Sequence, residues 1–442
     1  MEILIKALQF ILSFFILILV HEIGHFIFAR IFRVRVDKFY LFFDPWFSLF
    51  KYKPKNSDTE YGIGWLPFGG YCKMSGMIDE SMDKEQLAQP PQPWEFRSKP
   101  APARLAILFG GVLFNFLLAL VIFSMILFKW GDAYLPLKNM QMGMKYSDAF
   151  KEAGFQDGDI LLAANGRELE RLNGENIRAM LEAGTVTVLR DGRSVDISMP
   201  PGLLMKRALA DGLAYPSPRF PMIIHELESA GAPAALAGLK PGDHIISIDG
   251  IPTPSFDDVT SLLLGGEKNR AVSIGFMRDG EERFISLTLN ENRRMGVYVV
   301  PVNELYPTVK VSYGFFASFP AGARLGVNTL TSYVRDMKYV FTKEGASNIG
   351  GFITIAKLFP SMWDWRSFWM MTAFLSIILA FMNFLPIPAL DGGHLLFILY
   401  EIVTRRKPNE KFLVYAQVMG MALLFALMLY ANGNDIFRLI SK

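Results

Sequence analysis

Four long apolar stretches limit this chain of 442 residues to folds that cross a lipid bilayer. They run over residues 7–29, 105–128, 367–390 and 412–431, and Glu22 is the only formal charge in any of them. Each stretch has the roughly 20 apolar residues that a helical crossing needs. A hydrophobic share of 51% also argues against a soluble enzyme of this length. The sequence therefore predicts a polytopic α-helical membrane protein with four transmembrane helices.

The first stretch has one alternative interpretation, a cleaved signal peptide. A signal peptide carries its positive charges before the apolar run. Here only Lys6 precedes the run, whereas Arg30, Arg33 and Arg35 follow it. We therefore expect the stretch to remain in the membrane as a helix.

The basic residues of the loops predict one orientation. The loop over residues 30–104 carries 12 lysines or arginines, and the loop over residues 391–411 carries four. Short loops rich in lysine and arginine stay in the cytoplasm. Both termini and the long insert between residues 131 and 366 are then expected outside the cytoplasm.

The insert contains an internal repeat. Residues 153–166, which end in Asn165-Gly166, return 84 residues later as residues 237–250, which end in Asp249-Gly250. Such pairs between alternating β-branched residues predict hairpin turns. The second repeat resembles a bacterial PDZ domain and the first is a weaker match. PDZ domains bind an extended peptide as an added strand, and steric filtering by size is an equal alternative.

The first apolar stretch contains the motif His21-Glu22-Ile23-Gly24-His25. Residues four apart lie on one face of a helix, so both histidines can hold one ion, with Glu22 beside them for acid–base chemistry. Ionisable groups inside a membrane are costly and usually functional. The single cysteine, Cys72, excludes a thiolate zinc cluster. The motif therefore predicts zinc held by nitrogen and oxygen ligands.

A catalytic zinc needs a third protein ligand. Asp391 is the best candidate, because Pro386 and Pro388 break the apolar stretch just before it. His394 is the rival ligand, and its position favours a supporting role behind Asp391. The remaining two histidines are His225 and His244. Neither has a partner at a spacing that would form a zinc pair.

The two membrane motifs together resemble the site-2 protease family of intramembrane zinc metalloproteases, and the resemblance covers nearly the whole chain. The second motif runs from Asn383 through two prolines to Asp391-Gly392-Gly393. Further local matches are residues 61–74, residues 104–116 around Asn115, and residues 348–357. The chain departs from the family at Val112 and Phe352, where relatives usually have proline. Neither position is an expected zinc ligand.

The resemblance implies a role for each residue of these motifs. One zinc per chain would be held by His21, His25 and Asp391. Glu22 would activate the water, and Asn383 would contact the substrate near the scissile bond.

The resemblance also implies a membrane-reentrant β-hairpin after the first span, which receives the substrate as an extra strand. The expected substrate contacts are Tyr61, Gly62, Gly69 and Gly70. Aromatic, strand-like runs over residues 38–43, 46–53 and 59–68 agree with it, separated by breaks at 44–45 and 55–58. An interfacial aromatic belt without substrate contact is the alternative.

The implied substrates are single-pass membrane proteins, such as an anti-sigma factor already trimmed by an upstream site-1 protease, and signal peptide remnants. This would place the protein in regulated intramembrane proteolysis and envelope stress signalling, as a multi-pass protein of the bacterial inner membrane with a periplasmic insert and periplasmic termini. A net charge of +3 without a long basic run gives no case for nucleic acid.

Two other classes of protein are alternatives to a protease. A membrane-anchored PDZ scaffold without catalysis would not need Glu22. A metal transporter would need a second ring of ligands along the spans, which the sequence lacks.

The expected domain order follows from these assignments. It is a first transmembrane helix (1–32), a cytoplasmic-side loop with the hairpin (33–102), a second transmembrane helix (103–130), a first PDZ domain (131–220), a second PDZ domain (221–306), an amphipathic linker (307–366), a third transmembrane helix (367–392), a cytoplasmic loop (393–411) and a fourth transmembrane helix (412–434).

Overall fold

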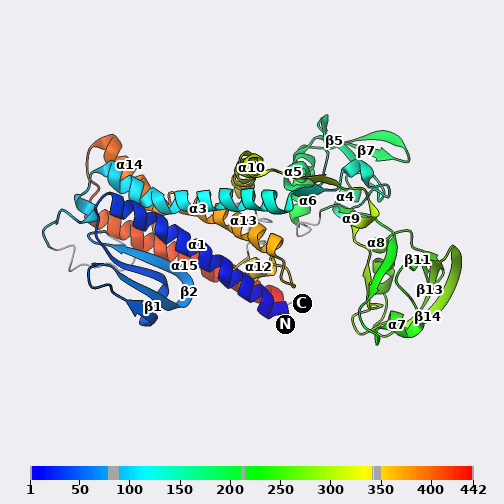
Figure 1. Cartoon of the computed structure of the whole chain (residues 1–442). Helices are drawn as coiled ribbons and strands as arrows, with labels where there is room; N and C mark the ends of the chain where they lie inside the picture. The colour runs from blue at the N-terminus through cyan, green and yellow to red at the C-terminus, as the bar shows by residue number, and fades with distance from the viewer. Residues whose placement is uncertain (1, 78–88, 211–214, 341, 343–349, 441–442) are drawn as a thin grey trace. The chain divides into compact units, whose positions relative to one another are not determined.

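The computed structural model describes residues 2–77, 89–210, 215–340, 342 and 350–440 (Figure 1). The chain divides into two compact units. The first combines Met1–Gly131 with Ser312–Lys442, and the second is Asp132–Val311.

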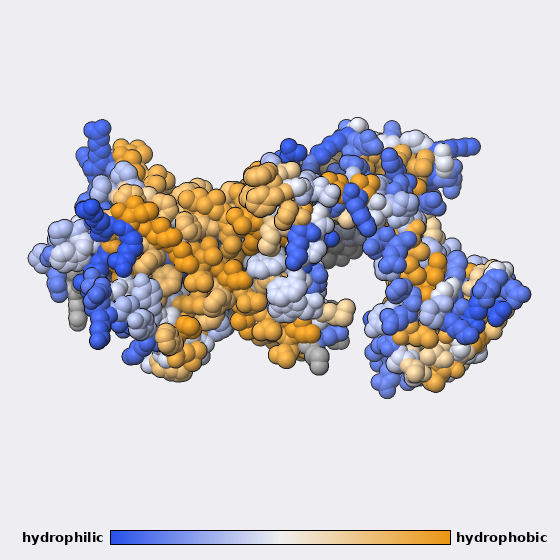
Figure 2. All heavy atoms as spheres, viewed as in Figure 1, coloured by the Kyte–Doolittle hydropathy of each residue, from blue (hydrophilic) through white to orange (hydrophobic). Residues whose placement is uncertain are grey.

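Within its described residues, the first unit contains four helices that are long and apolar enough to cross a membrane, as predicted. They are α1 (Glu2–Ile31), α3 (Ala101–Trp130), α13 (Trp365–Phe384) and α15 (Glu410–Ile440). Helix α3 packs against both α1 and α13 (Figure 1). Figure 2 shows hydrophobic residues over much of this unit, as a lipid-facing surface requires.

Two glycines set the distance between α1 and α3. A Cβ on Gly24 would lie 2.3 Å from the carbonyl oxygen of Gly110, and a Cβ on Gly110 would lie 2.7 Å from that of Gly24. The two backbones are therefore in direct contact, which only residues without side chains permit.

The third transmembrane helix ends earlier than predicted. We expected it to reach residue 392, but α13 ends at Phe384, and a new helix, α14 (Asp391–Thr404), begins at Asp391. The reason is that Pro386 and Pro388 have no amide hydrogen and cannot continue the helix. Much of the predicted loop 393–411 is therefore helical, and Asp391 starts a helix.

The loop after α1 forms an antiparallel sheet of two long strands, β1 (Val36–Tyr52) and β2 (Glu60–Met74). Strand β1 runs through the predicted break at 44–45, but it bends there, with positive φ at Phe42 (66°) and Trp46 (74°). Because of this bend, β1 pairs with β2 more than once. Residues 38–41 pair with both 60–63 and 70–73, and residues 48–52 pair with 61–64.

The described part of the first unit contains three further helices. They are η1 (Phe96–Ser98), α10 (Phe315–Val340) and α12 (Phe352–Lys357). Helix α12 is tied to α15 at its start, because the Asp435 carboxylate accepts hydrogen bonds from the backbone amides of Gly351 and Thr354 and from the Thr354 hydroxyl. The side-chain oxygen of Asn432 accepts a further bond from the Phe352 amide.

The second unit contains two sheets that correspond to the two sequence repeats. The first sheet has the order β6-β5-β7-β8, and the second has the order β14-β13-β11-β10-β15 with β12 paired to β11. The strands of the first sheet are β5 (Ile160–Ala164), β6 (Arg167–Glu168), β7 (Thr185–Arg190) and β8 (Arg193–Ser198). Those of the second are β10 (Met222–Leu227), β11 (His244–Ile248), β12 (Ile251–Pro252), β13 (Ala271–Arg278), β14 (Glu281–Thr288) and β15 (Val297–Val299). Their helices are α4 (Asp148–Lys151), α5 (Gly174–Glu182), α6 (Leu203–Ala210), α7 (Pro233–Ala237) and α8 (Phe256–Leu264).

The repeat extends to a buried ion pair. In the first sheet Arg190 Nη2 lies 2.6 Å from Asp159 Oδ2, and in the second Arg278 Nη2 lies 2.6 Å from Asp243 Oδ2. Both carboxylates are 1% exposed, so each pair fixes the same corner of its sheet. The sequence repeat therefore reflects a structural repeat.

Short elements join the parts of this unit. They are β3 (Asp132–Tyr134) paired with β16 (Val309–Val311), β4 (Met144–Lys145) paired with β9 (Ser217–Pro218), η2 (Leu137–Asn139) and α9 (Val302–Leu305). The pairing of β3 with β16 brings the two ends of the insert together.

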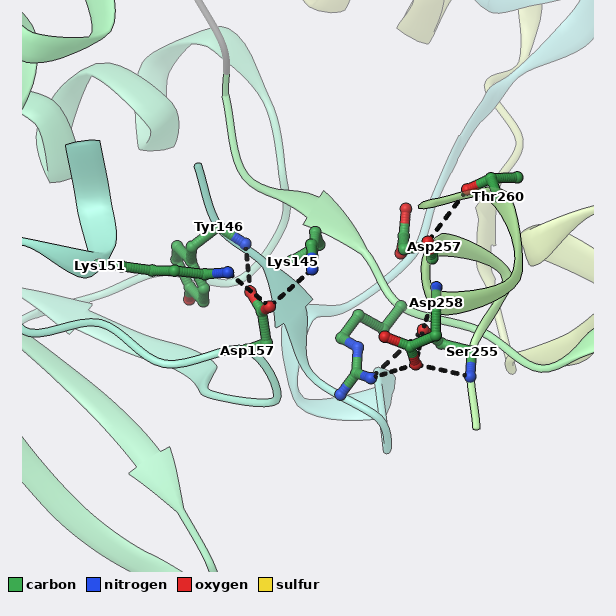
Figure 3. A network of polar contacts seen from close by, with 9 residues as sticks. Lys145, Tyr146, Lys151, Asp157, Ser255, Asp257, Asp258 and Thr260 are labelled. Carbon is green, nitrogen blue, oxygen red and sulfur yellow. Dashed lines mark hydrogen bonds and ion pairs between the residues drawn. The ribbon is translucent and has the colours of Figure 1, made fainter. Parts of the chain in front are cut away.

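Figure 3 shows polar contacts beside β4 and at the start of α8. Lys145 and Lys151 contact Asp157 Oδ2 at 2.7 and 2.8 Å. Partial burial raises the pKa of Asp157, but the hydrogen bonds from the two lysines and from the Tyr146 amide outweigh it and lower that pKa to about 2. The ionised carboxylate therefore ties β4 to the loop that carries Asp157.

Candidate metal centre

The two histidines of the HExxH motif lie on the buried face of α1. Apolar residues without a proline keep this helix regular from Glu2 to Ile31, so positions four apart stay on one face. The Nε2 atoms of His21 and His25 lie 3.2 Å apart, and both side chains are buried.

Asp391 completes a triangle of ligand atoms. Its Oδ2 lies 3.2 Å from His21 Nε2 and 3.3 Å from His25 Nε2. Four ligands about 2.0 Å from a tetrahedral ion are about 3.3 Å from one another, so these spacings fit zinc. Among the described residues Asp391 Oδ2 receives no hydrogen bond, although it is buried. A divalent cation would supply the missing partner.

Two glycines let the chain bring Asp391 back to α1. A Cβ on Gly392 would lie 2.0 Å from the carbonyl oxygen of Leu385, and one on Gly393 would lie 2.6 Å from that of Ile387. Larger residues would collide with the backbone of residues 385–388, which follows α13. The turn over residues 387–390, here called the ligand turn, leads into Asp391. Its packing requires the two glycines that follow Asp391.

Residues of helix α3 contact the Nδ1 atoms of both imidazoles and so orient the rings. The Nδ1 of His25 lies 3.0 Å from the carbonyl oxygen of Ile107, which accepts a hydrogen bond and leaves Nε2 free to bind a metal. The Nδ1 of His21 lies 3.3 Å from the side-chain amide of Asn115. A Cβ on Gly111 would lie 2.4 Å from His25 Nε2, so only glycine leaves room for the rings.

Glu22 lies beside the triangle and is buried with it, at 8% exposure. Its carboxylate interacts with His21, His25 and Asp391, and it accepts a hydrogen bond from the backbone amide of Cys72 in β2. A Cβ on Gly70 would lie 3.4 Å from Glu22 Cγ. The predicted general base therefore faces the ligand atoms on one side and strand β2 on the other.

The other predicted site residues fall into two groups. Asn383, near the end of α13, points its Nδ2 at His21 Nε2 from 3.4 Å, so it lies where a group bound at the metal would be. His394 is not among the residues that form the ligand cluster within the described chain. His225 and His244 lie in the second unit, on β10 and β11.

The expected substrate contacts of the hairpin lie at two different places in the sheet. Tyr61 pairs with both Phe39 and Tyr52, and Gly62 pairs with both Tyr40 and Lys51. Their backbone groups are therefore inside the sheet, because β1 bends and pairs with them from both sides. Among the described residues, residues 70–74, which lie next to Glu22, pair only with residues 36–41 of β1. Gly69 and Gly70 belong to this side of the strand.

The geometry agrees with comparison to known proteins. A family model described as peptidase family M50 matches residues 9–427. The chain belongs to peptidase family M50. This confirms the resemblance to the site-2 proteases and makes the protein a zinc metalloprotease.

Relatives of this M50 peptidase match over nearly their full lengths. Proteins named "Putative zinc metalloprotease" from Borreliella burgdorferi and Vibrio cholerae are each 27% identical, and cover 98% and 99% of this chain and 98% and 100% of their own. One from Neisseria meningitidis is 28% identical and covers 98% of this chain and 99% of its own. A PDZ domain from Listeria monocytogenes covers 19% of this chain and 90% of its own, with 19% identity and a TM-score of 0.17.

Sequence reasoning missed two contributors to the M50 site. Asn115 received no role from the sequence, although a polar amide in an apolar span is itself a signal, and the structure shows it fully buried. Gln417 in α15 carries the same signal, and its side-chain oxygen accepts a hydrogen bond from the Ala389 amide just before Asp391. What each touches could not be read from the sequence.

Proposed function

We propose that this M50 peptidase cleaves the membrane-embedded segments of single-pass proteins after their outer parts have been removed. One observation carries the proposal. The metal-ligand triangle and Glu22 lie on long apolar helices, and a β-strand runs directly beside Glu22. A soluble peptidase has no use for a site on such helices.

The chain's own residues account for most of the chemistry. His21, His25 and Asp391 would hold zinc, which when bound polarises the scissile carbonyl and activates water. Glu22 would take the proton from that water and pass it to the leaving amine. Asn383 would hold the scissile region through its side-chain amide, because that group lies 3.4 Å from His21 Nε2.

A substrate helix must unwind before it can be cut, because its carbonyls are bound within the helix. The unwound segment needs new hydrogen-bond partners inside the membrane. The edge formed by residues 69–73 of β2 would supply them by strand addition, within reach of Glu22. Selection would then depend on how easily the substrate unwinds more than on its side chains.

The substrate class and the compartment belong to the same proposal. Anti-sigma factors already trimmed by a site-1 protease, and signal peptide remnants, are single-pass segments with short outer parts. The membrane would be a bacterial inner membrane, and the loop charges favour an orientation with the insert and both termini on the periplasmic side. The two repeat units of the insert would act as PDZ domains that keep bulky outer domains away from the site.

The test uses full-length enzyme and two versions of one single-pass substrate, with either a folded outer domain or a short stub. A second enzyme lacks the insert. Because β3 pairs with β16, residues 135–308 can be replaced by an Asn-Gly hairpin turn that preserves both strands. Glu22→Gln versions of both enzymes are the inactive controls.

We expect the full-length enzyme to cut only the stub, and the shortened enzyme to cut both. If neither enzyme cuts the stub inside its apolar segment, the proposed activity is wrong. If the shortened enzyme still requires trimming, the insert is not the filter, although the activity stands.

A further inference from the structure

We propose that Gln417, on a helix that supplies no metal ligand, is a positioning residue that holds Asp391 at the zinc site. The Gln417 side chain is 3% exposed, and its Oε1 accepts a hydrogen bond from the Ala389 amide at 3.2 Å. Ala389 lies two residues before Asp391. This hydrogen bond joins α15 to the ligand turn.

The turn that delivers Asp391 has an unfavourable residue at its most demanding position. The Leu390 amide donates to the carbonyl of Ile387 at 3.1 Å, which closes a turn with Pro388 and Ala389 at its centre. Ala389 has a φ of 78°. Since proline fixes a negative φ before it, this is a type II turn, in which the third position strongly prefers glycine. An alanine there needs support from its surroundings.

Helix α15 supplies that support at both ends of the central peptide. The amide hydrogen between Pro388 and Ala389 points at Gln417. The carbonyl oxygen of the same peptide lies against Gly420, where a Cβ would be 2.0 Å away. Gln417 and Gly420 are three residues apart and share one face of the helix. If the peptide rotated into a type I turn, its oxygen would face Oε1 and the hydrogen bond would be lost.

This contact bears directly on the metal site. The next residue, Leu390, leads into α14, whose first residue is Asp391. A rotation of the turn would swing the carboxylate away from His21 and His25. Most of α15 is otherwise exposed, as a lipid-facing helix should be. Gln417 is therefore a buried polar contact to the ligand turn on a helix whose residues are mostly exposed.

The test measures zinc retention by full-length enzyme in detergent, as the rate of release to a colorimetric chelator. Gln417→Leu removes the acceptor at similar volume. Ala389→Gly removes the unfavourable alanine, and the double variant combines the two. Asn432→Leu is the matched control, because Asn432 is also a hydrogen-bond acceptor on α15 but contacts Phe352 and not the ligand turn.

We expect Gln417→Leu to lose zinc about 2- to 10-fold faster than wild type, the range that one net hydrogen bond supports. Ala389→Gly alone should retain zinc at least as well as wild type. The double variant should return to within about 2-fold of Ala389→Gly, because glycine holds the turn without help. Asn432→Leu should release zinc at the wild-type rate.

Three results would overturn the proposal. They are wild-type zinc retention in Gln417→Leu, a double variant as weak as Gln417→Leu, and equal loss in Asn432→Leu. The double variant also tests for misfolding. If Gln417→Leu simply disrupted α15, a glycine at position 389 would not restore zinc retention.

Discussion

The side-chain amide of Asn115 lies 3.3 Å from Nδ1 of His21, on the side of the ring that faces away from the other ligands. When Nε2 serves the metal, Nδ1 carries a proton and needs an acceptor. The Oδ1 of Asn115 has no partner among the described residues, and a half-turn of the amide would bring it to Nδ1.

Replacing Asn115 should therefore weaken metal binding without removing a ligand. We expect Asn115→Leu to bind zinc about 10- to 100-fold more weakly, as is usual for groups that orient a ligating histidine. Asn115→Asp keeps an acceptor and should stay close to wild type. Zinc competition with a chelator of known affinity measures both. Equal affinities in the leucine variant and wild type would contradict this role.

The ligand variants should separate metal binding from proton transfer. Alanine at His21, His25 or Asp391 should abolish both bound zinc and cleavage, because two ligands do not complete the site. Glu22→Gln should keep zinc and lose cleavage by at least about 100-fold, since glutamine cannot take the proton. Metal analysis and a cleavage assay on the same preparations give the answer. One zinc per chain in Asp391→Ala would point to His394 instead.

Gly70 should tolerate no side chain. A Cβ there would lie 2.7 Å from Ile18 Cγ2 and 2.9 Å from the carbonyl oxygen of Tyr40, so β2 would have to move away from Glu22. We expect Gly70→Val to keep zinc but to cleave at least about 10-fold more slowly, since catalytic geometry is sensitive to about 1 Å. Cys72→Ser is the control, because it preserves the backbone amide that contacts Glu22. Normal cleavage by Gly70→Val would show that β2 does not position the base.

The second unit should lose stability in acid through Asp157. Its folded-state pKa of about 2 lies below the unfolded value of about 3.9, so its contribution is complete above the unfolded value and is lost as the pH falls toward 2. Hydrogen exchange of residues 144–159 in wild type and Asp157→Asn, compared at matched pH, measures the effect. We expect wild type to be about 2- to 5-fold better protected at pH 6, and the difference to shrink by pH 3. A difference that does not change with pH would mean that the carboxylate charge is not responsible.

The parts of the site that follow helical spacing could be predicted from the sequence, and the parts set by backbone bends could not. His21 and His25 share a face because they are four residues apart. The prolines after Asn383 predicted an interrupted helix. The position of Tyr61 depended on the bend of β1 at Phe42 and Trp46, where non-glycine residues take positive φ. The sequence marks a break at residues 44–45, but it does not show that the chain on both sides of this break pairs with the same residues of β2.

Gln417 shows a second limit of the same kind. A lone glutamine in an apolar span predicts a buried polar contact, but it does not identify the partner. That partner is a backbone amide whose direction depends on a type II turn around Pro388. A proline at the second position of a turn allows both type I and type II, and the alanine after it favours type I.

The backbone contact between Gly24 and Gly110 limits how this protease can open. Two helices that touch through their main chains have no side-chain layer in which to slide or roll, so α1 and α3 should move as one rigid body. His21, His25, Glu22 and the groups that orient both rings all belong to that body. Admission of a substrate must then come from its movable neighbours, the β1–β2 sheet on one side and the Asp391 turn on the other, and a crosslink between α1 and α3 should leave turnover unchanged.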